Sequence, residues 1–176
     1  LEVNKTYGIG DNGEIQSVVF GLFASEDIVA SDGKKIPKDG LIQAVNVSSD
    51  GTFGFDADLP IGHKYYVKEI STDNHYILDD TKYPVDFEYK GQDVEKQTIN
   101  INDNKVIKNS LKYGKLSGLK KDDLGNKLQG VTFGLFKSTE TKFTKDTAIV
   151  TTTTDKNGKF EFTNIPVGDY KLVELK

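Results

Sequence analysis

The sequence predicts an all-β protein built from two tandem β-sandwich domains. Short runs of alternating β-branched and aromatic residues recur along the chain, and Asn-Gly or Asp-Gly pairs separate many of them. Such pairs supply the positive φ angles of tight hairpin turns, and many short strands joined by regular turns are typical of a sandwich. In addition, a series of landmarks occurs twice in the same order, which indicates duplication of one domain type.

The duplication involves three motifs and a strand that follows them. In each copy these motifs are followed by an alternating strand with a glutamate among apolar residues, Glu69 in the first copy and Glu174 in the second. The offset between the copies is 133 − 20 = 113 residues at the first landmark and 174 − 69 = 105 at the last. The matching segments are 20–23 with 133–136 (Phe-Gly-Leu-Phe), 51–55 with 158–162 (Gly-x-Phe-x-Phe), and 60–62 with 166–168 (Pro-x-Gly).

The strand pattern defines the extent of each copy. The first copy, residues 1–112, contains every expected strand, whereas the second, residues 113–176, lacks the strands that should follow its glutamate. We therefore expect a complete sandwich followed by one truncated at its C-terminal end. Strands of the first copy are expected at residues 17–23, 42–47, 52–55, 65–70, 85–89, 98–101 and 106–109.

Composition excludes several classes of protein. The 176 residues carry a formal net charge of −4, which provides no basic face for nucleic acid. No apolar run reaches the length of a membrane span. The absence of cysteine excludes disulfides and cysteine-based metal sites or nucleophiles. We expect no metal and no cofactor.

Three polar residues of the first copy stand at positions that the pattern turns inward. Lys5 has the same parity as apolar Val3 in the first strand, Glu69 follows Tyr65-x-Val67, and Asn109 closes the last strand. Buried charges are costly, so these positions require a reason. A buried salt bridge, or strand ends that reach water, would provide one. A reactive cluster would provide another.

The motifs resemble those of the collagen-adhesin B-type domains, also called SpaA-like pilin domains, of Gram-positive surface proteins. The family's box reads Tyr-x-Leu-x-Glu-Thr-x-Ala-Pro-x-Gly-Tyr, and its first strand typically ends in Lys-x-Asp. Residues 71–75 lack the usual Ala-Pro-x-Gly, and the first copy keeps only the lysine of Lys-x-Asp. The matching residues are Tyr65, Val67, Glu69 and Tyr76 in the first copy, and Tyr170, Leu172, Glu174 and Lys120-Lys121-Asp122 in the second.

This resemblance implies an immunoglobulin-like, prealbumin-like sandwich with an intramolecular isopeptide bond. The amine of Lys5 would join the side-chain carbonyl carbon of Asn109 and release ammonia, with Glu69 as the assisting acid. Burial would lower the pKa of the amine and raise that of the acid, which suits these roles. In the second copy the resemblance assigns Lys120, with Lys121 as its rival, and Glu174, but the chain holds no partner asparagine.

The resemblance also implies a function. We expect a stalk or shaft module of a cell-wall-anchored extracellular adhesin or pilin. Neighbouring domains of the same protein would be its partners, and host matrix or other pilin subunits are further candidates. The bond would form once per molecule, so the chain is not expected to be an enzyme. The alternative is a module that itself binds a host-matrix protein or a carbohydrate, and an exposed apolar or aromatic groove would favour it.

Overall fold

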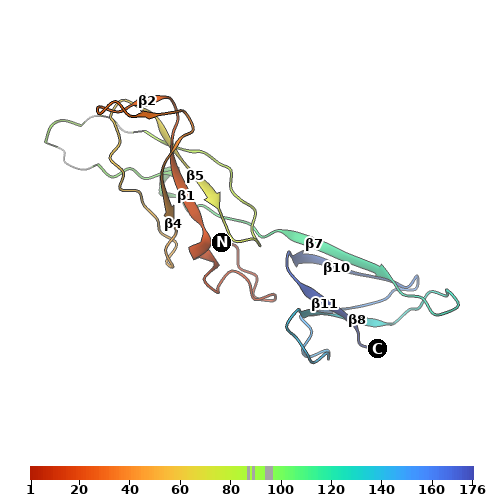
Figure 1. The fold of residues 1–176 in the computed structure, drawn as a ribbon. Coiled ribbons are helices and arrows are strands. Elements are labelled where there is room, and N and C mark those ends of the chain that lie inside the picture. Colours follow the sequence, from red (N-terminus) through yellow and green to blue (C-terminus); the bar gives the residue numbers. More distant parts are fainter. Residues whose placement is uncertain (87, 89, 94–96) are drawn as a thin grey trace. The chain divides into compact units, whose positions relative to one another are not determined.

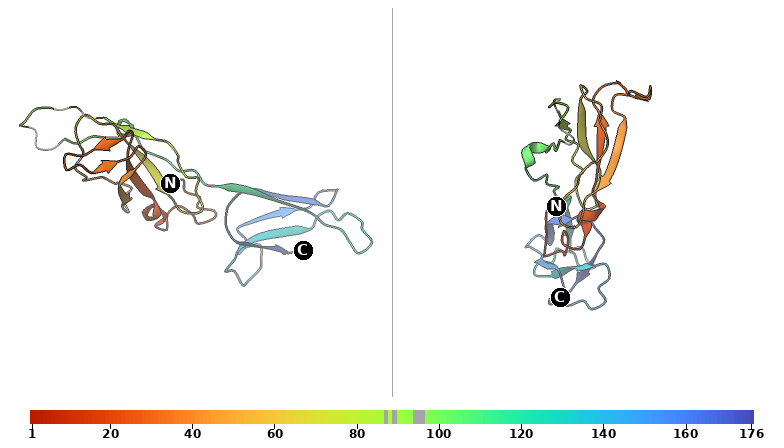
Figure 2. Two further views of the ribbon diagram at one scale, coloured as in Figure 1. Left: turned by 45° about the horizontal axis from the view of Figure 1, so that its top comes forward. Right: turned by 90° about the vertical axis from the view of Figure 1, so that its left-hand side faces the viewer.

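The structure is a computed structural model that describes residues 1–86, 88, 90–93 and 97–176. The chain forms two compact units. Unit 1 comprises Leu1–Val3 and Gly10–Ser110, and unit 2 comprises Asn4–Ile9 and Leu111–Lys176. Strands and loops build both units (Figures 1 and 2), and the described residues form no α-helix. No helix in this part of the chain has the length and apolarity needed to cross a membrane.

A four-stranded antiparallel sheet in the order β4-β1-β5-β6 is the centre of unit 1. The right-hand view of Figure 2 shows β4, β1 and β5 side by side. Alternate side chains of β1 and β5 point into one apolar core, which explains their β-branched and aromatic composition. The elements are η1 (Glu14–Ser17), β1 (Val19–Ala24), β2 (Ile28–Val29), β3 (Lys35–Ile36), β4 (Leu41–Asn46), β5 (Tyr65–Ser71), β6 (Tyr83–Val85) and η2 (Asn102–Asn104).

Unit 2 contains two small antiparallel sheets, β10-β7 and β11-β8-β9. Their inward side chains meet in a second core around Leu135 and Phe162. The strands are β7 (Tyr113–Leu119), β8 (Thr132–Lys137), β9 (Val150–Thr153), β10 (Lys159–Pro166) and β11 (Tyr170–Glu174).

The repeated motifs form the same aromatic core in both units. Phe20 stacks on Phe53 with ring centroids 4.1 Å apart, and Phe133 stacks on Phe160 at 4.2 Å. In each unit the second phenylalanine of the Gly-x-Phe-x-Phe motif meets the first edge-on. Stacked and edge-to-face pairs are the favoured aromatic arrangements. The duplicated sequence motifs therefore make equivalent packing contacts in the two units.

Several expected strands are confirmed, and others are wrong. The expected strands at 17–23, 42–47 and 65–70 correspond to β1, β4 and β5, whereas residues 52–55, 98–101 and 106–109 carry no strand. Side chains from all three segments still pack against the core of unit 1. Alternation reports which side chains face a core, but it does not show that the backbone finds a pairing partner. Of the expected strand at 85–89, residues 87 and 89 lie outside the described residues.

Candidate functional site

Strand β5 carries Glu69 into the interior of unit 1. Tyr65, Val67 and Glu69 alternate on its inner face, and Glu69 pairs with Phe20 of β1. The side chain of Glu69 is fully buried, with a relative exposure of 0%. The period of two in the sequence thus placed this carboxyl correctly, because successive strand residues point to opposite faces.

Asn109 meets Glu69 in the interior. The Asn109 side chain is buried, and its Nδ2 donates to both carboxyl oxygens of Glu69 at 2.8 Å. The same Nδ2 lies 3.2 Å from the carbonyl oxygen of Ile77. The backbone oxygen of Asn109 accepts a 3.0 Å hydrogen bond from the N–H of Glu2, which joins the first residues of unit 1 to the segment that ends it. A carboxyl and a carboxamide from distant parts of the chain are therefore in contact.

Burial raises the pKa of Glu69 above its usual range, because the carboxylate loses its hydration. The hydrogen bond from Asn109 and a 3.3 Å bond from the backbone N–H of Asp79 favour the charged form and oppose part of this rise. The negative charge of Asp79 adds to the rise. Asp79 was not among the predicted site residues, because it reaches the carboxyl from a loop, where strand periodicity gives no signal.

The sequence predicted that Lys5 faces inward beside Val3 in a first strand, but residues 5–8 form a turn and Lys5 is exposed in unit 2. Its role in a cross-link stays a prediction.

The turn that carries Lys5 is closed by its own backbone. Asn4 and Ile9 exchange two hydrogen bonds of 2.8 and 3.1 Å, and Ile9 is buried. Tyr7 packs edge-on against Tyr170, with ring centroids 5.8 Å apart. These contacts direct Tyr7 toward the core of unit 2 and leave Lys5 in solvent.

Replacing Glu69 by glutamine is expected to stabilise unit 1 increasingly as the pH rises. Because the folded-state pKa of Glu69 lies above its ordinary value of 4.5, unfolding releases its proton between these two values, and stability is lost as pH rises through that window. Glutamine mimics the neutral acid and has no such loss. Within the window the difference should grow by about 1.4 kcal/mol per pH unit.

Urea unfolding from about pH 2 to pH 8 would measure this difference, with Lys5→Ala present in both proteins to prevent any covalent bond. Asp50→Asn is a useful comparison, because hydrogen bonds from Ser48 and Thr52 lower the pKa of Asp50 to about 2. Removing the Asp50 carboxyl should lower the free energy of unfolding, and this effect should fade as the pH falls toward the lowered pKa of Asp50. A Glu69→Gln effect that stays constant across the pH range would contradict the assignment.

In unit 2 the structure brings the two predicted residues together. The Nζ of Lys120 lies 2.8 Å from Oε2 of Glu174, and both side chains are partly exposed. Lys120 follows β7, and Glu174 pairs with Phe133 of β8. Lys121, the rival amine, is exposed and bridges to Lys127 through its backbone. The Lys-x-Asp spacing therefore selected the lysine that contacts the glutamate.

A close backbone contact at Gly158 holds Lys120 in place, so Gly158→Ala should destabilise unit 2 by about 2–4 kcal/mol. The oxygen of Gly158 accepts a 2.8 Å hydrogen bond from the N–H of Lys120. A Cβ at Gly158 would lie 2.4 Å from the oxygen of Lys120, and its φ is +73°. Gly125→Ala is the matched control, since Gly125 has φ +84° but nothing within 4 Å. Thermal unfolding showing equal losses for the two variants would refute the role of the contact.

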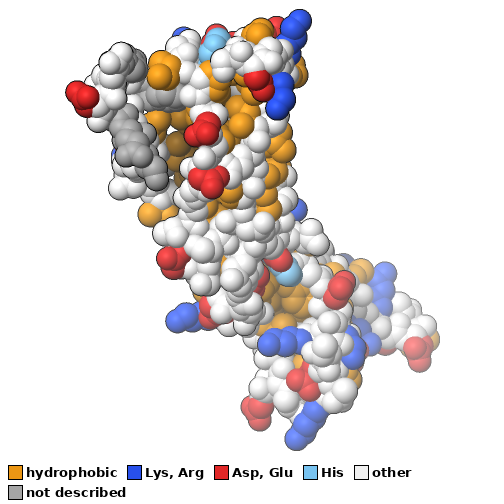
Figure 3. Space-filling model, turned by 60° about the vertical axis from the view of Figure 1, so that its left-hand side comes forward, with side chains coloured by type: hydrophobic (Ala, Val, Ile, Leu, Met, Phe, Trp, Pro, Cys, Tyr) orange, Lys and Arg blue, Asp and Glu red, His pale blue; other side chains and the backbone are white. Residues whose placement is uncertain are grey.

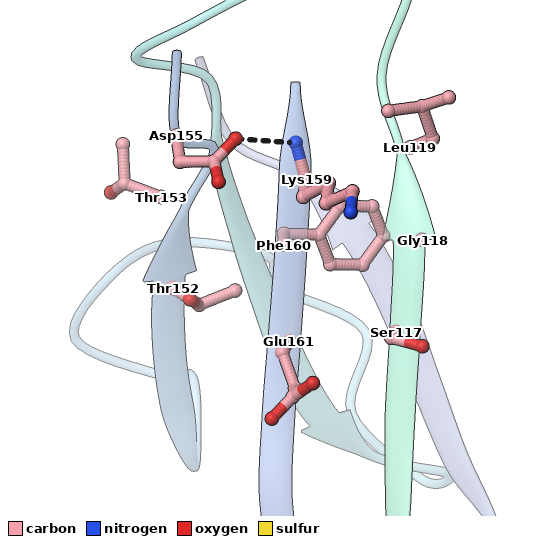
Figure 4. A pocket seen from close by; sticks show the side chains of 9 residues that line it. All are labelled: Ser117, Gly118, Leu119, Thr152, Thr153, Asp155, Lys159, Phe160 and Glu161. Atoms are coloured by element: carbon pink, nitrogen blue, oxygen red, sulfur yellow. Dashed lines mark hydrogen bonds between the residues drawn. The ribbon is translucent and has the colours of Figure 1, made fainter. Parts of the chain in front are cut away.

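The face of β7 and β10 also carries a hollow of about 620 Å³, lined mostly by polar side chains (Figure 4). Phe160 is its aromatic residue. One ring face of Phe160 stacks on Phe133, and a Cβ on Gly118 would lie 2.4 Å from the ring. The ring therefore offers no free face for a sugar. In Figure 3 hydrophobic side chains reach the surface beside acidic groups.

The comparisons with known proteins identify the family. The chain matches the model of the SpaA prealbumin-like fold domain over residues 1–105 and 114–176. It belongs to this family, and the predicted all-β, prealbumin-like fold is confirmed. A comparison with curated proteins found no match.

Solved structures are similar at low sequence identity. The Bacillus anthracis TIE protein has a TM-score of 0.54 and 17% identity, covering 94% of this chain and 26% of that one. The C-terminal fragment of the pilus adhesin SpaC from Lactobacillus rhamnosus GG has a TM-score of 0.49 and 14% identity, covering 100% of this chain and 70% of that one. BcpA, the major pilin subunit of Bacillus cereus, has a TM-score of 0.32 and 14% identity, covering 90% of this chain and 83% of that one. The similarity to the TIE protein shows a shared fold, and this chain spans 26% of that protein's length.

Proposed function

We propose that the chain is a stalk or shaft module of a Gram-positive surface adhesin or pilin, built from tandem domains at residues 1–112 and 113–176. Its work is to project a binding tip outside the cell wall and to withstand force and proteolysis. Family membership supports the general role. The observation that carries the proposal is the buried contact between Glu69 and Asn109, a carboxyl and a carboxamide that are 40 residues apart in the sequence.

The pair is suited to autocatalytic formation of an isopeptide bond with Lys5. The neutral Nζ of Lys5 attacks Cγ of Asn109, the bond from Cγ to Nδ2 breaks, and ammonia leaves. Half a turn of the carboxamide lets protonated Glu69 donate to Oδ1 and stabilise the oxyanion. Glu69 then carries the proton from the attacking amine to the departing nitrogen. The rise in its pKa favours the protonated form that this step uses.

The bond requires the turn at residues 4–9 to open. Leu1 packs against the core of unit 1, and Glu2 already pairs with Asn109. If residues 1–5 continue as one extended strand, Lys5 has the same parity as Leu1 and faces inward. The two backbone hydrogen bonds between Asn4 and Ile9 are the contacts that this change would break.

A single-molecule pulling experiment with handles at the two termini tests the mechanical role. With the bond in place, force passes through it and bypasses 109 − 5 = 104 residues, so the wild type should show only the extension of unit 2. Asn109→Ala should add about 350 Å of released contour length, since an extended residue spans about 3.3–3.6 Å. The mechanical role would be abandoned if the wild type released this length as well.

A solid-phase binding assay separates this role from the alternative of a host-binding module. We expect no saturable binding of the chain to matrix proteins or to glycans, since the described residues that line the hollow leave no aromatic face free. Saturable binding that is lost with Phe160→Ala, but kept by the exposed control Phe143→Ala, would favour the alternative.

A further inference from the structure

We infer that Asp79 and Tyr83 are positioning residues for the Glu69–Asn109 pair. They hold a loop against the pair and place a second negative charge beside its carboxyl. The functional meaning of this inference rests on the proposed isopeptide chemistry, whereas its structural content can be tested separately.

The loop at residues 77–79 touches both members of the pair. The oxygen of Ile77 accepts from Asn109 Nδ2 at 3.2 Å, and the N–H of Asp79 donates to Glu69 Oε1 at 3.3 Å. The N–H of Ile77 in turn donates to the oxygen of Ser110 at 2.9 Å. A shift of this loop would therefore disturb the carboxamide and the carboxyl together.

Tyr83 anchors the loop through the side chain of Asp79. The hydroxyl of Tyr83 donates to Asp79 Oδ2 at 2.6 Å, and Asp79 Oδ1 accepts from the N–H of Thr81 at 3.0 Å. Tyr83 lies in β6 opposite Val67, two residues before Glu69 on the same face of β5. Burial and the bond to Asp79 raise the pKa of Tyr83 to about 12, so the phenol remains a donor at all ordinary pH values.

The charge of Asp79 has a second effect. Its carboxylate favours the neutral form of Glu69, because two nearby negative charges repel. Asn109 hydrogen-bonds the carboxyl, and β1 presents apolar Phe20. Tyr83 therefore helps to position the loop, whereas Asp79 both positions the loop and places a negative charge near Glu69.

The first test measures the titration of Glu69 directly, by carbon NMR of its carboxyl in a Lys5→Ala background. Asp79→Asn keeps the backbone donor and removes the charge, and we expect it to lower the pKa of Glu69. Asp39→Asn is the matched control, because Asp39 accepts from Tyr66 at 2.8 Å in a similar pair elsewhere in unit 1. An unchanged pKa in Asp79→Asn would overturn the electrostatic part of the inference.

The second test follows the mass of chains isolated unfolded and then refolded by dilution. Tyr83→Phe should slow ammonia loss about tenfold, the effect of one well-placed hydrogen bond, and Tyr66→Phe should leave it unchanged. Asp79→Asn should move the alkaline limb of the pH–rate profile to lower pH. Equal rates for Tyr83→Phe and Tyr66→Phe would overturn the positioning role. If the wild type loses no ammonia, the cross-link proposal fails, and the NMR titration alone decides the inference.

Discussion

Replacing Asn109 by alanine should prevent the proposed covalent bond and destabilise unit 1 by about 5–8 kcal/mol. In the chain-entropy model, a closed loop of about 100 residues contributes about 4–5 kcal/mol. The remainder comes from Glu69, because alanine deprives a fully buried carboxyl of its hydrogen bonds from Asn109, at a cost of about 1–3 kcal/mol. Denaturant unfolding of the variant and the wild type measures the sum.

Two comparisons divide this effect into its parts. Lys5→Ala should remove the covalent contribution alone, because the contact between Glu69 and Asn109 remains. Asn100→Ala, at an exposed asparagine of the same segment, should change stability by less than about 0.5 kcal/mol. If Asn109→Ala costs no more than Asn100→Ala, neither the bond nor the buried pair stabilises the unit.

Leu22→Ala should lower the free energy of unfolding of unit 1 by about 2–5 kcal/mol, and Leu135→Ala should lower that of unit 2 by a similar amount. Both leucines belong to the repeated Phe-Gly-Leu-Phe motif, and each is 2% exposed in the core of its own unit. If residues 1–112 and 113–176 are separate domains, calorimetry should resolve two transitions. Leu22→Ala should move only the first unit's transition, and Leu135→Ala only the second's.

Exposed leucines provide the controls for this experiment. Leu41 of β4 is 52% exposed and Leu172 of β11 is 40% exposed, so their alanine variants should shift either transition only slightly. The two-domain proposal would be rejected if each core variant shifted both transitions equally, because the chain would then unfold as one cooperative body.

Much of the fold follows from periodicity in the sequence. The alternation of apolar and polar residues predicted the inner faces of β1 and β5 and the burial of Glu69, because one side of each strand must face the core. It did not predict which backbone segments pair with one another. The Gly-x-Phe-x-Phe motif is a strand in unit 2, where β10 pairs with β7, but residues 52–55 have no strand partner among the described residues. The same phenylalanine packing thus occurs with two different backbones.

The site was predictable in part, for a related reason. The positions of Glu69 and Glu174 depend on strand faces, and that of Lys120 depends on short local spacing. The position of Lys5 depends on a contact between Tyr7 and Tyr170, which are 163 residues apart and share no local pattern. Loop residues such as Asp79 carry no period at all, so only the three-dimensional structure could place them against the carboxyl.

Intact mass under denaturing conditions tests the central claim most directly. We expect the wild-type chain to weigh less than its sequence by the mass of one ammonia, and tandem mass spectrometry to recover a branched peptide joining Lys5 to Asn109. Lys5→Ala, Asn109→Ala and Glu69→Ala should each restore the full mass. A wild-type chain of full sequence mass, folded and with Glu69 and Asn109 still in contact, would contradict the account.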